Sequence, residues 1–531
     1  MGRSCVTGIF SLASRGAAGI CAPSLGYKRG PMRAPATLAT LLAAVALLLP
    51  ALSHAEAERD RFSAGGYFRI MTRPDLQGGD GRLGFWNLYG RLLNEGPHAM
   101  LEGRLEVLPP VSGRNEPWAT VHARVEGGTI SGADIRGGTL GDFRLSQLYV
   151  RAGNVLLDRV VWQVGTIESY FNDLGLYDMR PAQILENMVG LSARYDVGPV
   201  DVLLGVGDSG FALRRAQYST VFTAGGSLRY RLIPGRVELG AGGHAYFEPA
   251  VPGSRFAPYA TPGVRYEDFV RREVVRNYFE ENPGTEDFFP RPEPKDNLSW
   301  KAVGYLGFGG LGPLRWNNLF ANYQRVHPDN FYSEQFGGRD FLVFVSDLTD
   351  QRYQINVGNE MQLGIIPNRL DAVWGVVYGH HWNEDNEIAA GEDNRRFYST
   401  VLRLQLYLTR TTHFLVENAL AREQSLNGNL FRERQDSIFA NTGGIPDTRG
   451  LEYGDSDRRD TWQFKAGFVL NPTGPGIFTR PSLRLLYGLQ RSSQHAAFGS
   501  GFVEDLNQDN IFMGPERHSH HVVAIEAEGW F

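Results

Sequence analysis

Two strand-like stretches near the ends of the chain combine aromatic and charged side chains. In the terminal stretch HVVAIEAEGWF, Trp530 and Glu528 fall on one face, because side chains two residues apart on a strand point to the same side. In GGYFR, Tyr67 and Arg69 are related in the same way. Aromatic rings bind flat apolar surfaces, whereas arginine and carboxylate groups exchange hydrogen bonds with polar groups. The spacing predicts two small surfaces that could bind a polar molecule with an apolar face.

Other residues that could do chemistry do not form a reactive group. The motif GDSG at 207–210 resembles the nucleophile segment of serine proteases, but the His and Asp partners and their surrounding signatures are absent. A hairpin turn or loop start is therefore favoured. His518 and His520 could bind a metal from one strand face, but solvated histidines at a strand end are the favoured interpretation. We predict no catalytic residue, metal or cofactor.

The elements that must position these residues are strands. In VLRLQLYLT, at 401–409, every second residue is leucine and the residues between are mostly polar. The same alternation recurs at 100–108, 227–233, 482–491 and 521–531. An apolar face opposite a polar face fits a soluble sandwich, with the apolar face in a core. It also fits a membrane barrel, with that face in lipid and the polar face lining an aqueous interior.

The start of the chain favours the membrane barrel. Met32-Arg33, the apolar run Ala36–Leu52 and small residues up to Ala55 form a secretory signal peptide, with cleavage after Ala55 or Ala57. A single membrane anchor is the alternative. Both cysteines, Cys5 and Cys21, precede the cut, so no disulfide framework is expected. We predict an N-terminal extension with signal peptide at 1–55, whose true start could be Met32, and one barrel domain at 56–531.

The connections between predicted strands alternate in length. Short ones at 197–199, 233–235 and 366–368 contain Gly, Pro or Asn and read as tight turns. Long ones run over 249–297, 383–394, 427–460 and 494–518. This alternation is typical of a transmembrane antiparallel β-barrel in the outer membrane of a Gram-negative bacterium, with short periplasmic turns and long external loops. The net charge of −5 gives no reason to expect nucleic acid.

Several stretches together resemble the maltoporin-like sugar porins. They include DFRLSQLYVRAGN at 142–154, VGTIESYFNDLGLYD at 164–178, VWGVVYGHHWNEDN at 373–386 and FTRPSLRLLYG at 478–488. The resemblance implies an all-β fold, a trimeric barrel of 18 strands (16 being the alternative) whose third external loop folds inward. It also implies an aromatic track for sugar rings, flanked by charged groups for the hydroxyls. The segment 164–190 is then expected to narrow the pore.

The resemblance also implies roles for single residues. Tyr67 and Trp530 match track aromatics, and Phe320 is a further candidate. Arg69, Arg82 and Arg144 match arginines of the ionic track, and Asp178 matches an acidic residue of the inward loop. Arg180 stands where the family has a constricting tyrosine. A track tryptophan of the family falls near Ser492, where this chain has no aromatic residue. These departures put maltodextrin selectivity in question.

Three classes of function are compatible with these features. The first is a passive channel for sugars or oligosaccharides, and the second is a general or anion-leaning diffusion porin. The third is a barrel that is not a channel, such as an adhesin, an assembly factor or a hydrolase. For the favoured first class, the expected partners are sugars or other small solutes, the bilayer with lipopolysaccharide, and a homotrimer. The terminal Phe531 is expected to serve the barrel-assembly machinery.

Overall fold

The structure is a computed structural model of the 531-residue chain. It describes residues 61–74, 83, 87–109, 116–128, 143–210, 220–249, 296–325, 331–336, 339–344, 352–383, 395–425, 458–493 and 519–531. The predicted extension and signal peptide at 1–55 lie outside these residues, so they stay a prediction. None of the described residues forms a helix long and apolar enough to cross a bilayer.

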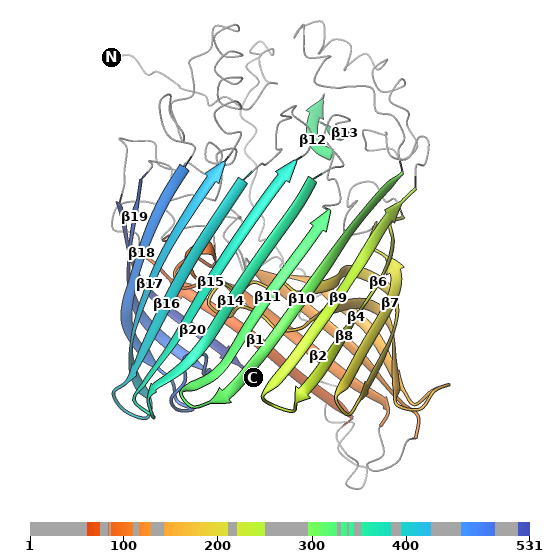
Figure 1. The fold of residues 1–531 in the computed structure, drawn as a ribbon, viewed down its shortest axis with the longest axis horizontal. Coiled ribbons are helices and arrows are strands. Elements are labelled where there is room, and N and C mark those ends of the chain that lie inside the picture. The colour runs from red at the N-terminus through yellow and green to blue at the C-terminus, as the bar shows by residue number, and fades with distance from the viewer. Residues whose placement is uncertain are drawn as a thin grey trace, which may run out of the picture.

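Eighteen antiparallel strands form one closed barrel, as the sequence predicts (Figure 1). Each barrel strand pairs with the next along the chain, and β1 pairs with β20 to close the sheet. The barrel strands are β1 (Phe62–Thr72), β2 (His98–Leu108), β3 (Trp118–Gly128), β4 (Phe143–Gly153), β5 (Val160–Tyr170), β6 (Gln183–Val197), β7 (Val200–Asp208), β8 (Phe222–Ile233), β9 (Val237–Glu248), β10 (Asn297–Leu311), β11 (Leu314–Arg325), β14 (Arg352–Ile366), β15 (Leu370–Asn383), β16 (Arg395–Tyr407), β17 (Thr412–Ser425), β18 (Arg458–Leu470), β19 (Ser482–Ser492) and β20 (Ser519–Trp530).

Three further elements lie in connections among the described residues. The strands β12 (Phe331–Phe336) and β13 (Arg339–Phe344) pair only with each other, and Figure 1 shows this hairpin beyond the rim of the barrel. A single 3-10 turn, η2 (Asn87–Tyr89), lies between β1 and β2. The connection that contains η2 packs against the inner wall of the barrel.

The alternating stretches place their apolar residues on the outer surface. On β16, Leu402 and Leu406 are exposed, whereas Arg403 and Gln405 are at most 2% exposed because they face the filled interior. The C-terminal strand follows the same rule, with Ile525 outside and Glu528 inside. A soluble barrel would have the opposite arrangement, since its polar residues must face water. An outer face of leucine, valine and aromatic residues suits contact with lipid.

The turns at one end of the barrel are short. Gly198, Gly235 and Asn368 adopt left-handed backbone angles in the turns β6–β7, β8–β9 and β14–β15. These are the three turns predicted from the sequence, and Gly or Asn is favoured there because other residues are strained at positive φ. The strand ends that flank the long connections lie at the opposite, upper end in Figure 1. The motif at 207–210 contains the end of β7, and Asp208 Oδ1 accepts hydrogen bonds from the N–H groups of Gly210 and Val221.

The hydrophobic core lies inside the barrel rather than between two sheets. Connections fold into the lumen and pack against the inner wall in two clusters of buried residues. The larger cluster contains Leu88, Tyr89, Ile167, Phe171, Leu174, Leu176, Tyr177, Ala182, Ile184, Leu185 and Met188 against wall residues such as Val303, Tyr305, Phe320, Val373 and Val401. The smaller contains Leu83, Leu92 and Leu93 against Leu415, Val469, Leu486, Val522 and Ala524. The lumen is therefore partly filled by packed chain.

Candidate functional site

The connection between β5 and β6 crosses the lumen and docks on the far wall. Glu360 of β14 accepts hydrogen bonds from the backbone N–H groups of Gly175, at 3.0 Å, and Leu176, at 2.7 Å. The Tyr177 hydroxyl donates to the Gly375 carbonyl of β15 at 3.0 Å. We call residues 171–182 the inward loop. It is the third connection at the long-loop end, after β1–β2 and β3–β4, so the predicted inward folding of the third external loop is confirmed.

The inward loop is held in a compact shape of its own. Leu174 N–H donates to the Met179 carbonyl at 2.8 Å, and Asp178 between them has a left-handed backbone with φ of 53°. The side chains of Leu174, Leu176 and Tyr177 are fully buried. Hydrogen bonds to a carboxylate are among the stronger ones in proteins, at about 1.5–3 kcal/mol each. Burial and the Glu360 contacts together explain why this loop stays inside the barrel.

A second connection enters the lumen, and the sequence did not predict it. Residues 87–97, between β1 and β2, lie beside the inward loop, and Arg91 N–H donates to the Leu176 carbonyl at 2.8 Å. Lys465 of β18 donates to the Tyr89 carbonyl at 2.8 Å and pairs with Glu417 of β17 at 2.8 Å. Lys465 and Glu417 are fully buried, and Glu417 also pairs with Arg403 at 2.6 Å. Removing Glu417 would therefore leave two buried cations without their carboxylate, at a high desolvation cost.

A third insertion comes from the short-turn end. The connection β18–β19, residues 471–481, places Ile477 in the larger hydrophobic cluster. Phe478 and Arg480 of the same segment line the cavity that remains between the insertions. The Phe478 ring lies 6.3 Å from the Trp316 ring of β11, and both residues contact the cavity. These two aromatic residues and Arg480 were not predicted as site residues.

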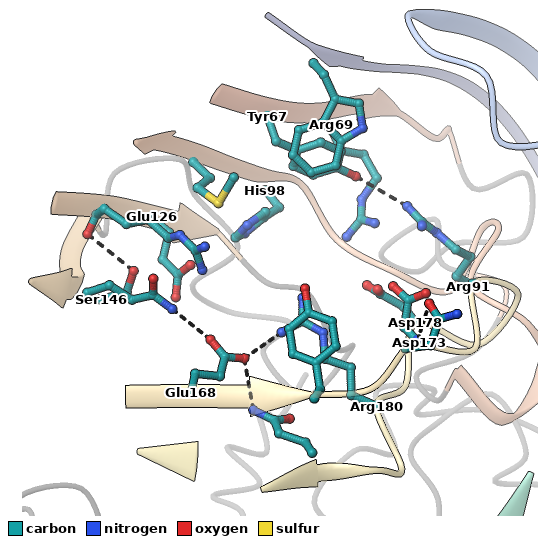
Figure 2. Close-up of a pocket in the computed structure, with 18 of the residues that line it drawn as sticks. Tyr67, Arg69, Arg91, His98, Glu126, Ser146, Glu168, Asp173, Asp178 and Arg180 are labelled. Carbon is teal, nitrogen blue, oxygen red and sulfur yellow. Dashed lines mark hydrogen bonds and ion pairs between the residues drawn. The ribbon is translucent and has the colours of Figure 1, made fainter. Parts of the chain in front are cut away.

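The three insertions leave a cavity of about 940 Å³ against the β1–β5 wall. Its aromatic residues are Tyr67, Tyr170, Trp316, Phe478 and Trp530, and its cationic residues are Arg69, Arg91, Arg124, Arg144, Arg180 and Arg480. The carboxyl groups are those of Glu126, Glu168, Asp173, Asp178 and Glu360. Figure 2 shows Arg69 and Arg91 on one side of this space and Asp173 and Asp178 facing them.

Six of the eight residues predicted from the sequence meet in this one cavity. They are Tyr67, Arg69, Arg144, Asp178, Arg180 and Trp530. Arg82 lies outside the described residues. Phe320 is placed elsewhere: it is fully buried in the larger hydrophobic cluster, with its ring 5.2 Å from that of Tyr305. Phe320 supports the inward loop and has no surface free for a solute.

The aromatic pair Tyr67–Trp530 forms one wall of the cavity. Tyr67 of β1 and Trp530 of β20 are register partners, and their ring centroids are 4.6 Å apart at an interplanar angle of 46°. The Arg480 guanidinium lies 5.7 Å from the Tyr67 ring and 5.8 Å from the Trp530 ring. Tyr67 is 8% exposed and Trp530 is 54% exposed, so the indole presents most of the available aromatic surface.

Glu528 joins the wall to two insertions. Its carboxylate accepts a hydrogen bond from Tyr67 at 2.6 Å and pairs with Arg91 at 2.5 Å and Arg480 at 2.6 Å. Arg484 of β19 adds a fourth contact at 2.7 Å. Three guanidinium groups around one buried carboxylate hold Tyr67, Arg91 and Arg480 in place.

A pair of carboxyl groups joins the two connections that enter from the long-loop end. Glu95 pairs with Arg69 and lies 3.4 Å from Arg91 Nε, and its side chain is hydrogen-bonded to that of Asp178. Burial raises the pKa of Glu95 to about 8, although Arg69 and Arg91 oppose the shift. Burial also disfavours the charge of Asp178, but Arg91 and the Glu95 hydrogen bond hold its pKa below the usual value. Near neutral pH, a protonated Glu95 can donate to an ionised Asp178.

A β-bulge turns Arg144 toward the cavity. In the β3–β4 ladder, Arg124 pairs with Gln147 and Val125 pairs with Leu145, which leaves Ser146 as the extra residue. One extra residue shifts the side-chain alternation by one, so Arg144 lies beside inward-facing Glu126, at 3.6 Å. Arg144 is 69% exposed and is the most accessible arginine of the ion pairs in the cavity. Across the space, Arg180 pairs with Glu168 at 2.7 Å and stacks on Tyr170.

These groups can bind and orient a solute but do not form a reactive constellation. Among the described residues, no three His, Cys, Asp or Glu side chains are arranged to hold a metal ion. The carboxylates of the cavity are largely engaged by arginine or by backbone N–H groups. A solute in the cavity can stack on the aromatic rings and form hydrogen bonds with the charged side chains.

Among known proteins, similarity is found to solved structures. No protein-family model and no curated protein matches the chain. Solved structures with similar barrels include OmpT, an outer membrane protein of Vibrio cholerae, at 9% identity and a TM-score of 0.35, over 90% of this chain and 100% of that one. The outer membrane channel DcaP of Acinetobacter baumannii matches at 8% identity and a TM-score of 0.41, over 90% and 99%. OpdL of Pseudomonas aeruginosa matches at 9% identity and a TM-score of 0.38, over 88% and 98%.

The location of the protein follows from its own surface. An even-stranded, closed antiparallel barrel that exposes leucine, valine and aromatic residues all around its wall is the architecture of the Gram-negative outer membrane. The chain is an outer-membrane β-barrel. None of these comparisons identifies a solute, so the preference for sugars that the sequence suggests stays a prediction.

Proposed function

We propose that this outer-membrane barrel is a passive channel for small polar solutes and that it prefers sugars or oligosaccharides. The proposal assigns the chain no catalytic activity. The observation that carries it is the exposed Trp530 ring beside Tyr67, on the wall of a cavity that the inward loop narrows. A pyranose ring has apolar C–H faces and a rim of hydroxyl groups, which match an indole face flanked by guanidinium and carboxylate groups.

The composition of the cavity suits passage rather than tight capture. Trp530 and Tyr67 lie on one wall, and Phe478 with Trp316 form a second aromatic contact. Several weak sites let a solute move from one to the next, whereas one tight site would retain it. The inward loop and Glu360 would set the width of the passage. Trimer formation is part of the proposal, because the sugar porins that the sequence resembles are trimers.

A second candidate function is an anion-leaning diffusion channel without sugar preference. Six arginines line the cavity against five carboxyl groups, and Arg144 is largely exposed. In this case small anions would pass more readily than small cations. The Arg144→Gln substitution should then shift the reversal potential in a salt gradient toward cation selectivity. Arg159→Gln, in the β4–β5 turn outside the cavity, is the matched control.

The deciding experiment measures single-channel conductance of the purified protein in planar bilayers with a panel of mono- and oligosaccharides. Concentration-dependent block of ion current by at least one sugar supports the sugar channel. Ion current without block by any sugar, together with anion selectivity that depends on Arg144, supports the second candidate. Absence of any ion current would contradict both. Crosslinking in native membranes tests the trimer separately.

A further inference from the structure

The connection between β18 and β19, residues 471–481, is the longest at the short-turn end of the barrel. Turns at the periplasmic end of an outer-membrane barrel are usually short. This connection instead turns back into the lumen, where Ile477 is buried in the larger hydrophobic cluster and Phe478 lines the cavity. We call residues 471–481 the periplasmic insertion. Its extra length contributes to the contents of the lumen rather than to the reversal of the chain.

Hydrogen bonds and an ion pair fix the periplasmic insertion to the wall. The side-chain amides of Gln405 on β16 and of Asn471 donate to the Gly476 carbonyl, at 3.2 and 3.3 Å. At the other end of the insertion, Arg480 pairs with Glu528 of β20 at 2.6 Å. Hydrogen-bonded pairs of arginine with carboxylate are among the stronger polar contacts in proteins. The insertion is therefore held at two separate parts of the barrel, β16 and β20.

The Phe478 ring lies where the periplasmic insertion meets the inward loop. A methyl group at Gly175 of that loop would lie 3.1 Å from the ring, so the ring depends on the absence of a side chain there. On its other sides, the ring lies 6.3 Å from the Trp316 ring of β11 and 5.9 Å from the guanidinium of Arg403 on β16. Two insertions that start at opposite ends of the barrel therefore touch inside the lumen.

Phe478 stands between the filled part and the open part of the lumen. Its neighbour Ile477 belongs to the larger hydrophobic cluster, whereas Phe478 is half-buried and lines the cavity. Gly175 and Trp316, which flank the ring, line the same cavity. Removal of the ring would therefore widen the cavity between β11 and the inward loop. The side chain at position 478 limits the space that is open to a solute.

We propose that the periplasmic insertion is a second restriction element of the channel and that Phe478 in it selects solutes by size. This inference rests on the channel function proposed above. The selectivity of a pore depends on its diameter and on the groups that line it, and an apolar ring at a constriction hinders bulky hydrated solutes. A solute with a flat apolar face can slide along the same ring. Arg480 and Gln405 are positioning residues, because they hold the insertion that carries the ring.

The test measures ion current through the purified full-length protein in planar bilayers, with polyethylene glycols of graded size as probes of the bore. Phe478→Ala removes the ring from the lumen. Phe468→Ala removes an exposed ring from the outer face of β18 and is the matched control. Heat-modifiable mobility on gels verifies that each barrel is folded. Neutral polymers report the width of the passage independently of any preference for sugars.

A thiol introduced at position 478 gives a second test in which the length of the chain and its fold are kept. Phe478→Cys is combined with Cys5→Ser and Cys21→Ser, which removes both native cysteines of the chain. A thiol reagent then adds a bulky neutral group at position 478. Arg410→Cys, in the exposed turn between β16 and β17, is modified in the same background as the control.

We expect Phe478→Ala to conduct severalfold more ion current than the wild type and to admit larger polymers, with Phe468→Ala like the wild type. Modification of Phe478→Cys should lower its conductance severalfold, and modification of Arg410→Cys should leave the conductance unchanged. Wild-type conductance and polymer cut-off in Phe478→Ala, or unchanged conductance after modification at position 478, overturn the restriction role and leave the channel function in place. An equal increase in Phe468→Ala also overturns that role. Absence of ion current in the wild type overturns both proposals.

Discussion

Tyr67 and Trp530 come from the first and last strands of the barrel and are direct register partners, with ring centroids 4.6 Å apart. Pairing of β1 with β20, which closes the barrel, brings them together although 463 positions of sequence separate the two residues. Tyr67 is held by Glu528, and Trp530 remains half exposed to the cavity. The pair is the part of the lumen best suited to contact a sugar ring.

Trp530→Ala should weaken sugar block of the ion current about tenfold, because stacking on an aromatic face contributes about 1–3 kcal/mol and 1.4 kcal/mol is a decade in affinity. Trp530→Phe should retain most of the block. Tyr67→Phe is the control for the hydrogen bond to Glu528, because it keeps the ring. The measurement is block as a function of sugar concentration in planar bilayers. Wild-type block in Trp530→Ala would contradict a stacking role.

Glu360→Ala should release the inward loop from the far wall. The N–H groups of Gly175 and Leu176 would lose their shared acceptor, at about 1.5–3 kcal/mol for each hydrogen bond. We expect a severalfold higher single-channel conductance with more current noise. Glu526→Gln, a lumen carboxylate that does not contact the loop, is the control and should conduct like the wild type. Unchanged conductance in Glu360→Ala would mean that the loop does not set the pore width.

The Glu95–Asp178 contact should make stability depend on pH. The pKa of Glu95 is raised from 4.5 to about 8, so the folded state holds a proton that the unfolded state releases between these values. Stability from this group is fully present below pH 4.5 and is lost as the pH rises toward about 8, by at most about 1.4 kcal/mol per pH unit. Glu95→Gln, which cannot ionise, should flatten the thermal stability measured between pH 5 and pH 9. An identical pH profile in that variant would refute this account.

Deleting Phe531 should impair assembly of the barrel. Phe531 exchanges two backbone hydrogen bonds with Gly66, at 3.0 and 3.1 Å, and its ring occupies the space where a side chain at position 66 would lie. Gly66→Val should therefore displace the ring and lower the outer-membrane yield as well. Gly103→Ala is the matched control, since a methyl group there meets only ordinary contacts. Heat-modifiable mobility and membrane yield are the measurements, and normal values for the deletion would rule out this role.

The strands and their faces follow directly from the sequence. The period-two alternation in stretches such as 401–409 predicts strands because it is local and repeats every 6–7 Å. It does not say which face meets lipid, and the signal-peptide pattern was needed to choose. The turns at Gly198, Gly235 and Asn368 were predictable for the same reason, since positive φ selects Gly or Asn.

The contents of the lumen were only partly predictable. The inward loop and six site residues followed from the sequence resemblance, and all six line one cavity. Arg91, Arg480 and Phe478 carry no local pattern that marks them as cavity residues, because they lie in irregular connections. Their positions depend on partners far away in the chain, such as Glu528 for Arg91 and Trp316 for Phe478.

The sequence by itself determined an all-β barrel whose strands alternate apolar and polar faces, with an aromatic pair at its closure, because periodicity and strand order are properties of the chain itself. Only the tertiary structure decided which connections fill the lumen and which way Arg144 points. The first depends on packing against strands far along the chain, through contacts such as Glu360 with Leu176. The second depends on one unpaired residue, Ser146, in a ladder whose register is set only when β3 and β4 meet.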